Sequence, residues 1–313
     1  MNFLNNRWIL LALAALALIA CKERDTHYEY FDDANSKPKK IFQVDKENGK
    51  MDGSYKEFRE NGNLYLEGTF KDGSRNGTFR EYREDGSLLM ENNYKDDVIE
   101  GIVKVYNRDK KLVSKGEIKD GSYVHQKFFT DPRDGKNYPV VAIGSRIWMA
   151  ANLNFYTSGS LCYGNKDEYC DKYGRLYTWY EAAEACPDGW DLPNYDEVNT
   201  LMDAVGGSAV AGRMLKSASG WYIKDWQKSG YGNDAYGFSA LPGGSASMLL
   251  GSLVFDGVFD EKNRSAQFWM STENEYNEDN AYRLGISTYL DNAYVISISK
   301  ASWHSVRCIK DVD

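Results

Sequence analysis

A repeat of 24 residues between about positions 48 and 122 constrains the fold of this chain more than any other feature. Aligned positions keep their character from unit to unit: they are Gly53, Gly77 and Gly101; Phe58, Tyr82 and Tyr106; Leu64, Leu88 and Leu112; and Phe70, Tyr94 and Ile118. Each of the first two units places alternating apolar and polar residues on both sides of Asn-Gly or Asp-Gly, a pattern that predicts a β-hairpin. One hairpin cannot hold a core alone, so we expect the units to stack into one continuous sheet.

The third unit departs from this pattern, as expected near the end of an array. Asp109-Lys110 replaces Asp-Gly, and Asp97 replaces the glycine that follows Lys-Asp in the first unit. The pattern resembles the MORN-type repeats, in particular their longer bacterial variant, a resemblance that implies scaffolding or partner contact. We expect the repeats, over residues 41–124, to act as a spacer; a dedicated binding surface is the alternative.

The first 21 residues, MNFLNNRWILLALAALALIAC, indicate export. Arg7 precedes an apolar run, residues 9–20, that is too short to span a bilayer comfortably. Its end, Leu18-Ile19-Ala20-Cys21, resembles the lipobox of bacterial lipoproteins. That resemblance implies a signal peptide over residues 1–20 and acylation of Cys21, which labelled palmitate would detect. It also implies a stable membrane anchor of two or more acyl chains. An ordinary secretory signal and a transmembrane anchor are the alternatives.

Residues 21–40 are polar and mixed in charge, which predicts a flexible tether. Lys22-Glu23 loosely resembles the surface-export signal of Bacteroidetes-like lipoproteins, although Arg24 interrupts it. We therefore expect a lipid anchor in the outer membrane and exposure at the cell surface.

Composition narrows the set of partners. The formal net charge is −8 and no segment is basic, which argues against a nucleic-acid partner. The 23 tyrosines indicate β-rich structure or a recognition surface, since tyrosine is bulky, stiff and amphipathic.

Four cysteines remain after Cys21: Cys162, Cys170, Cys186 and Cys308. An even count in an exported protein predicts two disulfides, with three connectivities open. A zinc site is the alternative, but the chain has no CxxC pair and three scattered histidines.

Residues 125–313 differ in character from the repeats. WYEAAEAC at 179–186 predicts a short amphipathic helix, and Asn194 is placed to cap a second helix with Val198, Leu201, Met202 and Val205 on its inner face. Further motifs are CYGN at 162–165, YGRLYTW at 173–179, CPDGWDLPNYDEV at 186–198, YGFSALPGG at 236–244, FWMSTEN at 268–274 and SVRCIK at 305–310.

In this order, the motifs closely resemble the Fibrobacter succinogenes major paralogous domain, a family of exported and often lipid-anchored surface proteins. The cysteine-bearing helix, the W-x-L-P turn and the second helix also resemble C-type-lectin-like domains and the related fold of the formylglycine-generating enzymes. These resemblances imply an α+β fold after the all-β repeats. They also imply disulfides Cys186–Cys308, as in C-type lectins, and hence Cys162–Cys170.

Catalysis has little support. The histidines stand beside no nucleophile motif, neither G-x-S-x-G nor H-E-x-x-H occurs, and the cysteines are better used as disulfides than as the reactive thiols of formylglycine-generating enzymes. We expect no enzyme, and a relative of those enzymes is the remaining catalytic alternative.

Binding has more support, and we expect a polysaccharide or an envelope protein as the partner. The candidate ligand-binding residues are aromatic side chains in a glycine-rich region, namely Trp221, Tyr222, Trp226 and Tyr231, whereas Tyr236 and Phe238 are expected to fill the core. An envelope scaffold is the competing class of function.

Calcium is the one cofactor left open. Asp256, Asp260 and Glu273 lie in acidic loops that could supply its oxygen ligands. The E-P-N, Q-P-D and W-N-D motifs of calcium-dependent lectins are absent, and a solvated acidic surface is the alternative.

Overall fold

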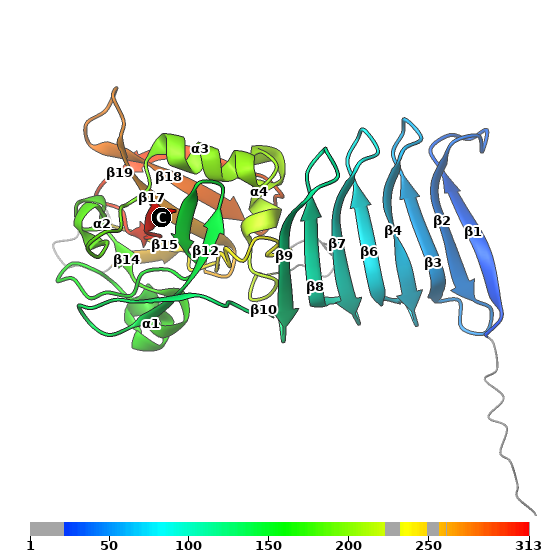
Figure 1. Cartoon of the computed structure of the whole chain (residues 1–313), viewed down its shortest axis with the longest axis horizontal. Helices are drawn as coiled ribbons and strands as arrows, with labels where there is room; N and C mark the ends of the chain where they lie inside the picture. The colour runs from blue at the N-terminus through cyan, green and yellow to red at the C-terminus, as the bar shows by residue number, and fades with distance from the viewer. Residues whose placement is uncertain (1–21, 223–231, 249–256, 261, 313) are drawn as a thin grey trace, which may run out of the picture.

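The computed structural model describes residues 22–222, 232–248, 257–260 and 262–312, and these form two parts (Figure 1). A row of antiparallel hairpins makes up the N-terminal part, here called the repeat sheet. A compact part with helices and several smaller sheets, here called the C-terminal part, packs against the later strands of the repeat sheet (Figure 1). The described residues are mostly β and include four α-helices.

The repeat sheet has ten strands, and its long strands pair only with their neighbours in the sequence, while β5 pairs with β4. The strands are β1 (Arg24–Tyr30), β2 (Pro38–Asp45), β3 (Met51–Phe58), β4 (Leu64–Lys71), β5 (Ser74–Arg75), β6 (Gly77–Tyr82), β7 (Leu88–Lys95), β8 (Val98–Tyr106), β9 (Leu112–Lys119) and β10 (Ser122–Tyr123). The continuous sheet of stacked hairpins predicted from the repeat is confirmed.

The turns repeat with the same period as the strands. Asp72, Asp96 and Asp120 each have φ of 50°, and the residue after each of them also has positive φ. Two consecutive left-handed residues make the type I′ turn that matches the twist of a hairpin. Asp97, with φ of 68°, takes the glycine position in the third unit. The degenerate third unit therefore keeps the turn and the sheet.

The flexible tether predicted over residues 21–40 is wrong for its described residues. Strands β1 and β2 pair as the first hairpin of the sheet, with Arg24 opposite Asp45. A polar, charge-mixed segment can form this hairpin because β1 is an exposed edge strand that needs no apolar face. The ammonium group of Lys22 also lies 3.1 Å from Asp45, so the chain is held from residue 22 onward.

Three smaller sheets build the C-terminal part. One contains β11 (Phe128–Thr130), β12 (Asn137–Ile143), β13 (Arg146–Met149) and β21 (Ile309–Asp311). The second contains β14 (Leu176–Tyr177), β20 (His304–Ser305), β17 (Ser265–Glu273), β18 (Asn280–Ser287) and β19 (Ala293–Ser299), and β15 (Ser245–Met248) pairs with β16 (Gly257–Asp260). Because β21 pairs with β13, the end of the chain returns to the beginning of this part.

Both predicted helices are confirmed. Helix α2 (Trp179–Ala185) follows Thr178, and helix α3 (Tyr195–Ala204) begins after Asn194, whose side chain accepts a hydrogen bond from the backbone of Glu197. The Glu197 carboxylate accepts from the Asn194 backbone in return, which completes a capping box. Helices α1 (Asp167–Tyr173) and α4 (Ser208–Leu215) were not predicted.

The structure contains two disulfides, Cys162–Cys170 and Cys186–Cys308, with Cα atoms 4.9 Å and 5.8 Å apart. This is the pairing that the family resemblance implies. The second bridge ties the end of α2 to the segment before β21, which adds a covalent link to the closure made by β13 and β21.

One hydrophobic core joins the two parts. Met90, Val103 and Ile118 from the repeat sheet are fully buried in the same cluster as Leu201 and Phe238 from the C-terminal part. The last repeat unit is therefore built into the C-terminal part and does not form a separate module. Within the described residues, no helix is long and apolar enough to cross a membrane.

Candidate functional site

The structure changes the assignment of the predicted ligand-binding aromatics. Trp221 is buried in the shared core and donates a 3.0 Å hydrogen bond to the Ser217 hydroxyl, so the prediction of a ligand-binding Trp221 is wrong. Tyr222 is 40% exposed and lies beside Arg264. Trp226 and Tyr231 lie outside the described residues. Tyr236 and Phe238 fill the core, as predicted.

The structure does not place the three predicted metal ligands, Asp256, Asp260 and Glu273, together in one site. Asp256 lies outside the described residues, and Asp260 belongs to β16 but its side chain is not described. Glu273 forms an ion pair with Lys300 at the end of β17. A calcium site at these residues stays a prediction.

A different group of carboxylates comes together at the start of the repeat sheet. Asp45, Asp52 and Asp72 are close enough to share a metal ion, and among the described residues they are the one such group. The Lys22 ammonium already contacts all three carboxylates, at 3.1, 3.3 and 2.7 Å. This group therefore holds the N-terminal end of the sheet, with lysine as its cation.

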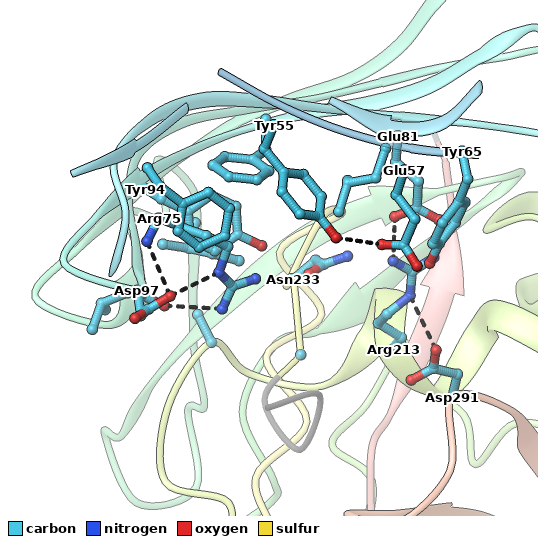
Figure 2. A pocket seen from close by; sticks show the side chains of 17 residues that line it. Tyr55, Glu57, Tyr65, Arg75, Glu81, Tyr94, Asp97, Arg213, Asn233 and Asp291 are labelled. Atoms are coloured by element: carbon cyan, nitrogen blue, oxygen red, sulfur yellow. Dashed lines mark hydrogen bonds and ion pairs between the residues drawn. The ribbon is translucent and has the colours of Figure 1, made fainter. Parts of the chain in front are cut away.

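A cleft of about 610 Å³ separates the first repeat units from the C-terminal part, and Figure 2 looks into it. The repeat sheet supplies one wall with the aromatic residues Tyr55, Tyr65, Phe70, Phe79 and Tyr94. The opposite wall comes from α4 and the segments beyond it, through Arg213, Ala218, Gly232, Asn233 and Asp291. The cleft is therefore lined by residues of both parts.

The repeat explains the aromatic wall. Tyr55 and Phe79 are 24 positions apart, as are Phe70 and Tyr94, so equivalent strands place these rings on one face. Ring centroids follow one another at 5.1, 5.6 and 5.3 Å in the order Tyr55, Phe70, Phe79, Tyr94. Tyr55 and Phe79 are buried, whereas Phe70 and Tyr94 are half-buried and remain available to a ligand.

The same positions become aliphatic in the third unit, and this change divides the cleft from the core. Val103 follows Tyr55 and Phe79 in the period, and Ile118 follows Phe70 and Tyr94. Both aliphatic side chains are fully buried against the C-terminal part. The aromatic-to-aliphatic change therefore marks where the sheet stops lining a cleft and starts sharing a core, a signal that the sequence contained but that our interpretation of it missed.

An ion-pair network lines the Tyr65 end of the cleft. The Arg213 guanidinium makes two hydrogen bonds to Glu81, and its Nε lies 3.6 Å from Asp291 (Figure 2). Burial alone would lower the pKa of Arg213, but the hydrogen bonds and charge of Glu81 raise it above its ordinary value. Arg213 therefore stays charged and links α4 to β6.

A second ion pair lies at the other end. Arg75 donates to the Asp97 carboxylate at 3.1 Å, and its guanidinium stacks 4.2 Å from the centroid of Tyr94. Its charge is matched by Asp97, and its planar face extends the aromatic wall.

Glu57 differs from the other carboxylates of the cleft. It accepts a 2.9 Å hydrogen bond from the Tyr55 hydroxyl, and no ion pair joins it to any cation among the described residues. Burial, followed by the charge and hydrogen bond of Glu57, raises the pKa of Tyr55. Tyr55 therefore stays protonated and keeps Glu57 in place.

The cleft adjoins a more open hollow of about 680 Å³, and Tyr65 lines both. Phe58 and Arg59 line the hollow beside it, with the Arg59 guanidinium 4.4 Å from the Tyr65 ring centroid. Tyr65 therefore lies between the cleft and the hollow.

One serine–histidine contact occurs on the other side of the interface. His125 Nε2 lies 3.2 Å from the Ser239 hydroxyl, which donates to Asp234 at 2.6 Å. Burial lowers the pKa of His125 to about 4. Because the carboxylate contacts the serine instead of the histidine, this arrangement differs from a serine–histidine–aspartate relay.

The two parts and their cleft define a class of protein: a hairpin-repeat sheet joined through a shared core to a disulfide-bonded α+β domain. Residues 141–310, more than half of the chain, match the Fibrobacter succinogenes major domain, so the chain belongs to this family. The MORN repeat variant matches twice before it, at residues 51–72 and 75–96. No curated protein matches the chain.

Proposed function

We propose that this chain is a lipid-anchored, surface-exposed binding protein that holds a glycan in the cleft between its two parts, without catalysing a reaction. The observation that carries the proposal is the wall of aromatic rings facing charged and amide side chains across about 610 Å³. Ligand sites are typically clefts of this size, with apolar walls and a few polar groups that fix orientation.

A glycan fits both walls. The apolar C–H faces of sugar rings suit the half-buried rings of Phe70 and Tyr94. Sugar hydroxyls need partners that donate and accept hydrogen bonds, and Asn233 and Glu57 are such partners in the lining. The adjoining hollow at Tyr65 favours an oligosaccharide or polysaccharide over a single sugar.

The proposal of an outer-membrane lipid anchor rests on the sequence of residues 1–21, with Cys21 as the acylated residue. Lys22 and the strands after it favour a short connection between that anchor and the sheet. In this arrangement the repeats hold the cleft away from the membrane, as a rigid spacer.

We propose the C-type-lectin-like fold, which the formylglycine-generating enzymes resemble, for residues 125–313. The helix-to-end disulfide Cys186–Cys308 and the pairing of β13 with β21 support it, because both bring the two ends of this part together.

A glycan array probed with the full chain in detergent tests the function. Tyr65→Ala removes a ring that lines both hollows, and Tyr276→Ala removes an exposed ring outside them as the matched control. We expect Tyr65→Ala alone to lose retention on the array. No retention of the wild type on any glycan contradicts the proposal, and abundant crosslinked protein partners in that case favour an envelope scaffold.

A further inference from the structure

The charges at the Tyr65 end of the cleft do not balance. Three carboxylates, those of Glu57, Glu81 and Asp291, line this end together with one cation, Arg213. Two more cations lie close by: Arg59 contacts the Tyr65 ring, and Lys40, opposite Glu57 in the sheet, pairs with Glu29. The carboxylates still exceed the cations by one. At the opposite end Arg75 and Asp97 cancel each other. The excess of negative charge is therefore confined to the end where the cleft opens toward the adjoining hollow.

Glu57 is the carboxylate that remains available. Arg213 directs its two hydrogen bonds to Glu81 and lies within ion-pair distance of Asp291, whereas no ion pair is formed by Glu57 within the described part of the chain. An ionised carboxylate can accept about four hydrogen bonds. Glu57 uses one of them for the Tyr55 hydroxyl, so it has capacity for a ligand.

Aromatic rings flank this carboxylate. Figure 2 shows the Glu57 carboxylate between the Tyr55 hydroxyl and the ring of Tyr65. A carboxylate beside aromatic rings suits an ammonium group, because the carboxylate accepts its N–H groups while ring faces attract its charge. An acidic sugar would meet the excess negative charge and is disfavoured at the same place.

We propose that the cleft selects a glycan that carries a free amine. In its protonated form, this amine contacts the Glu57 carboxylate beside the ring of Tyr65. This inference rests on the proposed glycan-binding function and adds the chemical class of the ligand. The aromatic wall holds the sugar rings, and Glu57 distinguishes an amino sugar from its N-acetylated form, which has no charge.

Calorimetric titration of the full chain in detergent with glucosamine oligomers and with N-acetylglucosamine oligomers of equal length tests the inference. We expect the glucosamine oligomer to bind roughly tenfold more tightly, the ratio that one charge-assisted hydrogen bond provides. Added salt should reduce this ratio. Glu57→Gln should abolish the ratio, whereas Glu117→Gln, at an exposed carboxylate of β9 outside the cleft, should preserve it.

Equal affinity for the two oligomers, or a ratio that survives in Glu57→Gln, overturns the inference. If both oligomers bind equally and Tyr65→Ala abolishes both, the inference fails while the proposed function stands. If neither oligomer binds, the inference fails, and the glycan array decides the proposed function separately. If a lysine-rich peptide binds and neither oligomer does, the amine that the cleft recognises belongs to a protein, and the inference of an amino sugar is wrong.

Discussion

The buried ion pair between Arg213 and Glu81 makes the coupling of the two parts measurable. The Glu81 side chain is 10% exposed and that of Arg213 is 14% exposed, so Glu81→Ala leaves a buried guanidinium without its main partner. Removing one member of a buried pair costs about 3–5 kcal/mol. Asp291 remains near Arg213, at 3.6 Å, so we expect the lower end of this range, about 3 kcal/mol.

Tryptophan fluorescence can measure the effect of this substitution on the C-terminal part. Apart from Trp8, every tryptophan lies between positions 148 and 303, so fluorescence reports on the C-terminal part while the substitution is in the repeat sheet. In urea, Glu81→Ala should shift the fluorescence transition and the circular-dichroism transition of the sheet together, to the same lower midpoint. The shared core requires this coincidence, since Met90 and Val103 cannot leave it without exposing the C-terminal part.

Arg80→Ala is the matched control. Arg80 neighbours Glu81 on β6, but its side chain is 45% exposed and pairs with Glu91, so its loss should cost less than about 1 kcal/mol. A tryptophan transition that is unchanged in Glu81→Ala, or that separates from the transition of the sheet, would refute the coupling argument.

Three further predictions follow from individual residues. Burial lowers the pKa of Lys216 to about 8, so between about pH 8 and pH 10.4 the unfolded chain binds one more proton than the folded chain. The stability of the wild type relative to Lys216→Met should therefore increase as the pH rises through this range. Denaturant midpoints measured across the range check this prediction. Cys186→Ser opens a loop of 122 residues and should lower the free energy of unfolding by about 5 kcal/mol. Cys162→Ser opens a loop of 8 residues and should lower it by about 2.5 kcal/mol, and thermal unfolding of both variants compares these losses. Cys21→Ser should leave the precursor uncleaved and unlabelled by radioactive palmitate, and normal processing of this variant would contradict the lipid anchor.

The repeat and the helices could be predicted because local chemistry determines them. Paired left-handed residues at Asp72 and Asp96 belong to turns that the sequence marks, and the cap at Asn194 is encoded within four residues. The prediction of a flexible tether over residues 22–40 was wrong because amino-acid composition indicates only whether a segment can form a buried hydrophobic core. Strand β1 buries little and is held by backbone pairing and ion pairs instead.

The cleft could not be predicted in the same way. Arg213 and Glu81 are 132 positions apart, and nothing local in either segment indicates their contact. Trp221 was misassigned for a related reason: a glycine-rich context suggests an exposed loop, but the indole lies against the core that the repeat sheet completes. Only the changes from Phe79 to Val103 and from Tyr94 to Ile118 at two repeat positions indicated that the third unit faces a different environment.

The pairing of each hairpin only with its neighbours allows the length of the sheet to be engineered. Insertion of one 24-residue unit between Asp45 and Met51 adds two strands, about 10 Å, and leaves every residue of the cleft in its place, since the cleft begins at Tyr55. The same insertion after Lys95 would instead separate the aromatic rings from α4 by that distance and dismantle the cleft. Variants of graded length made at the first position would therefore carry an identical cleft at different distances from the N-terminal end, and only the adjoining hollow would lose Phe31 and Lys37 from its lining.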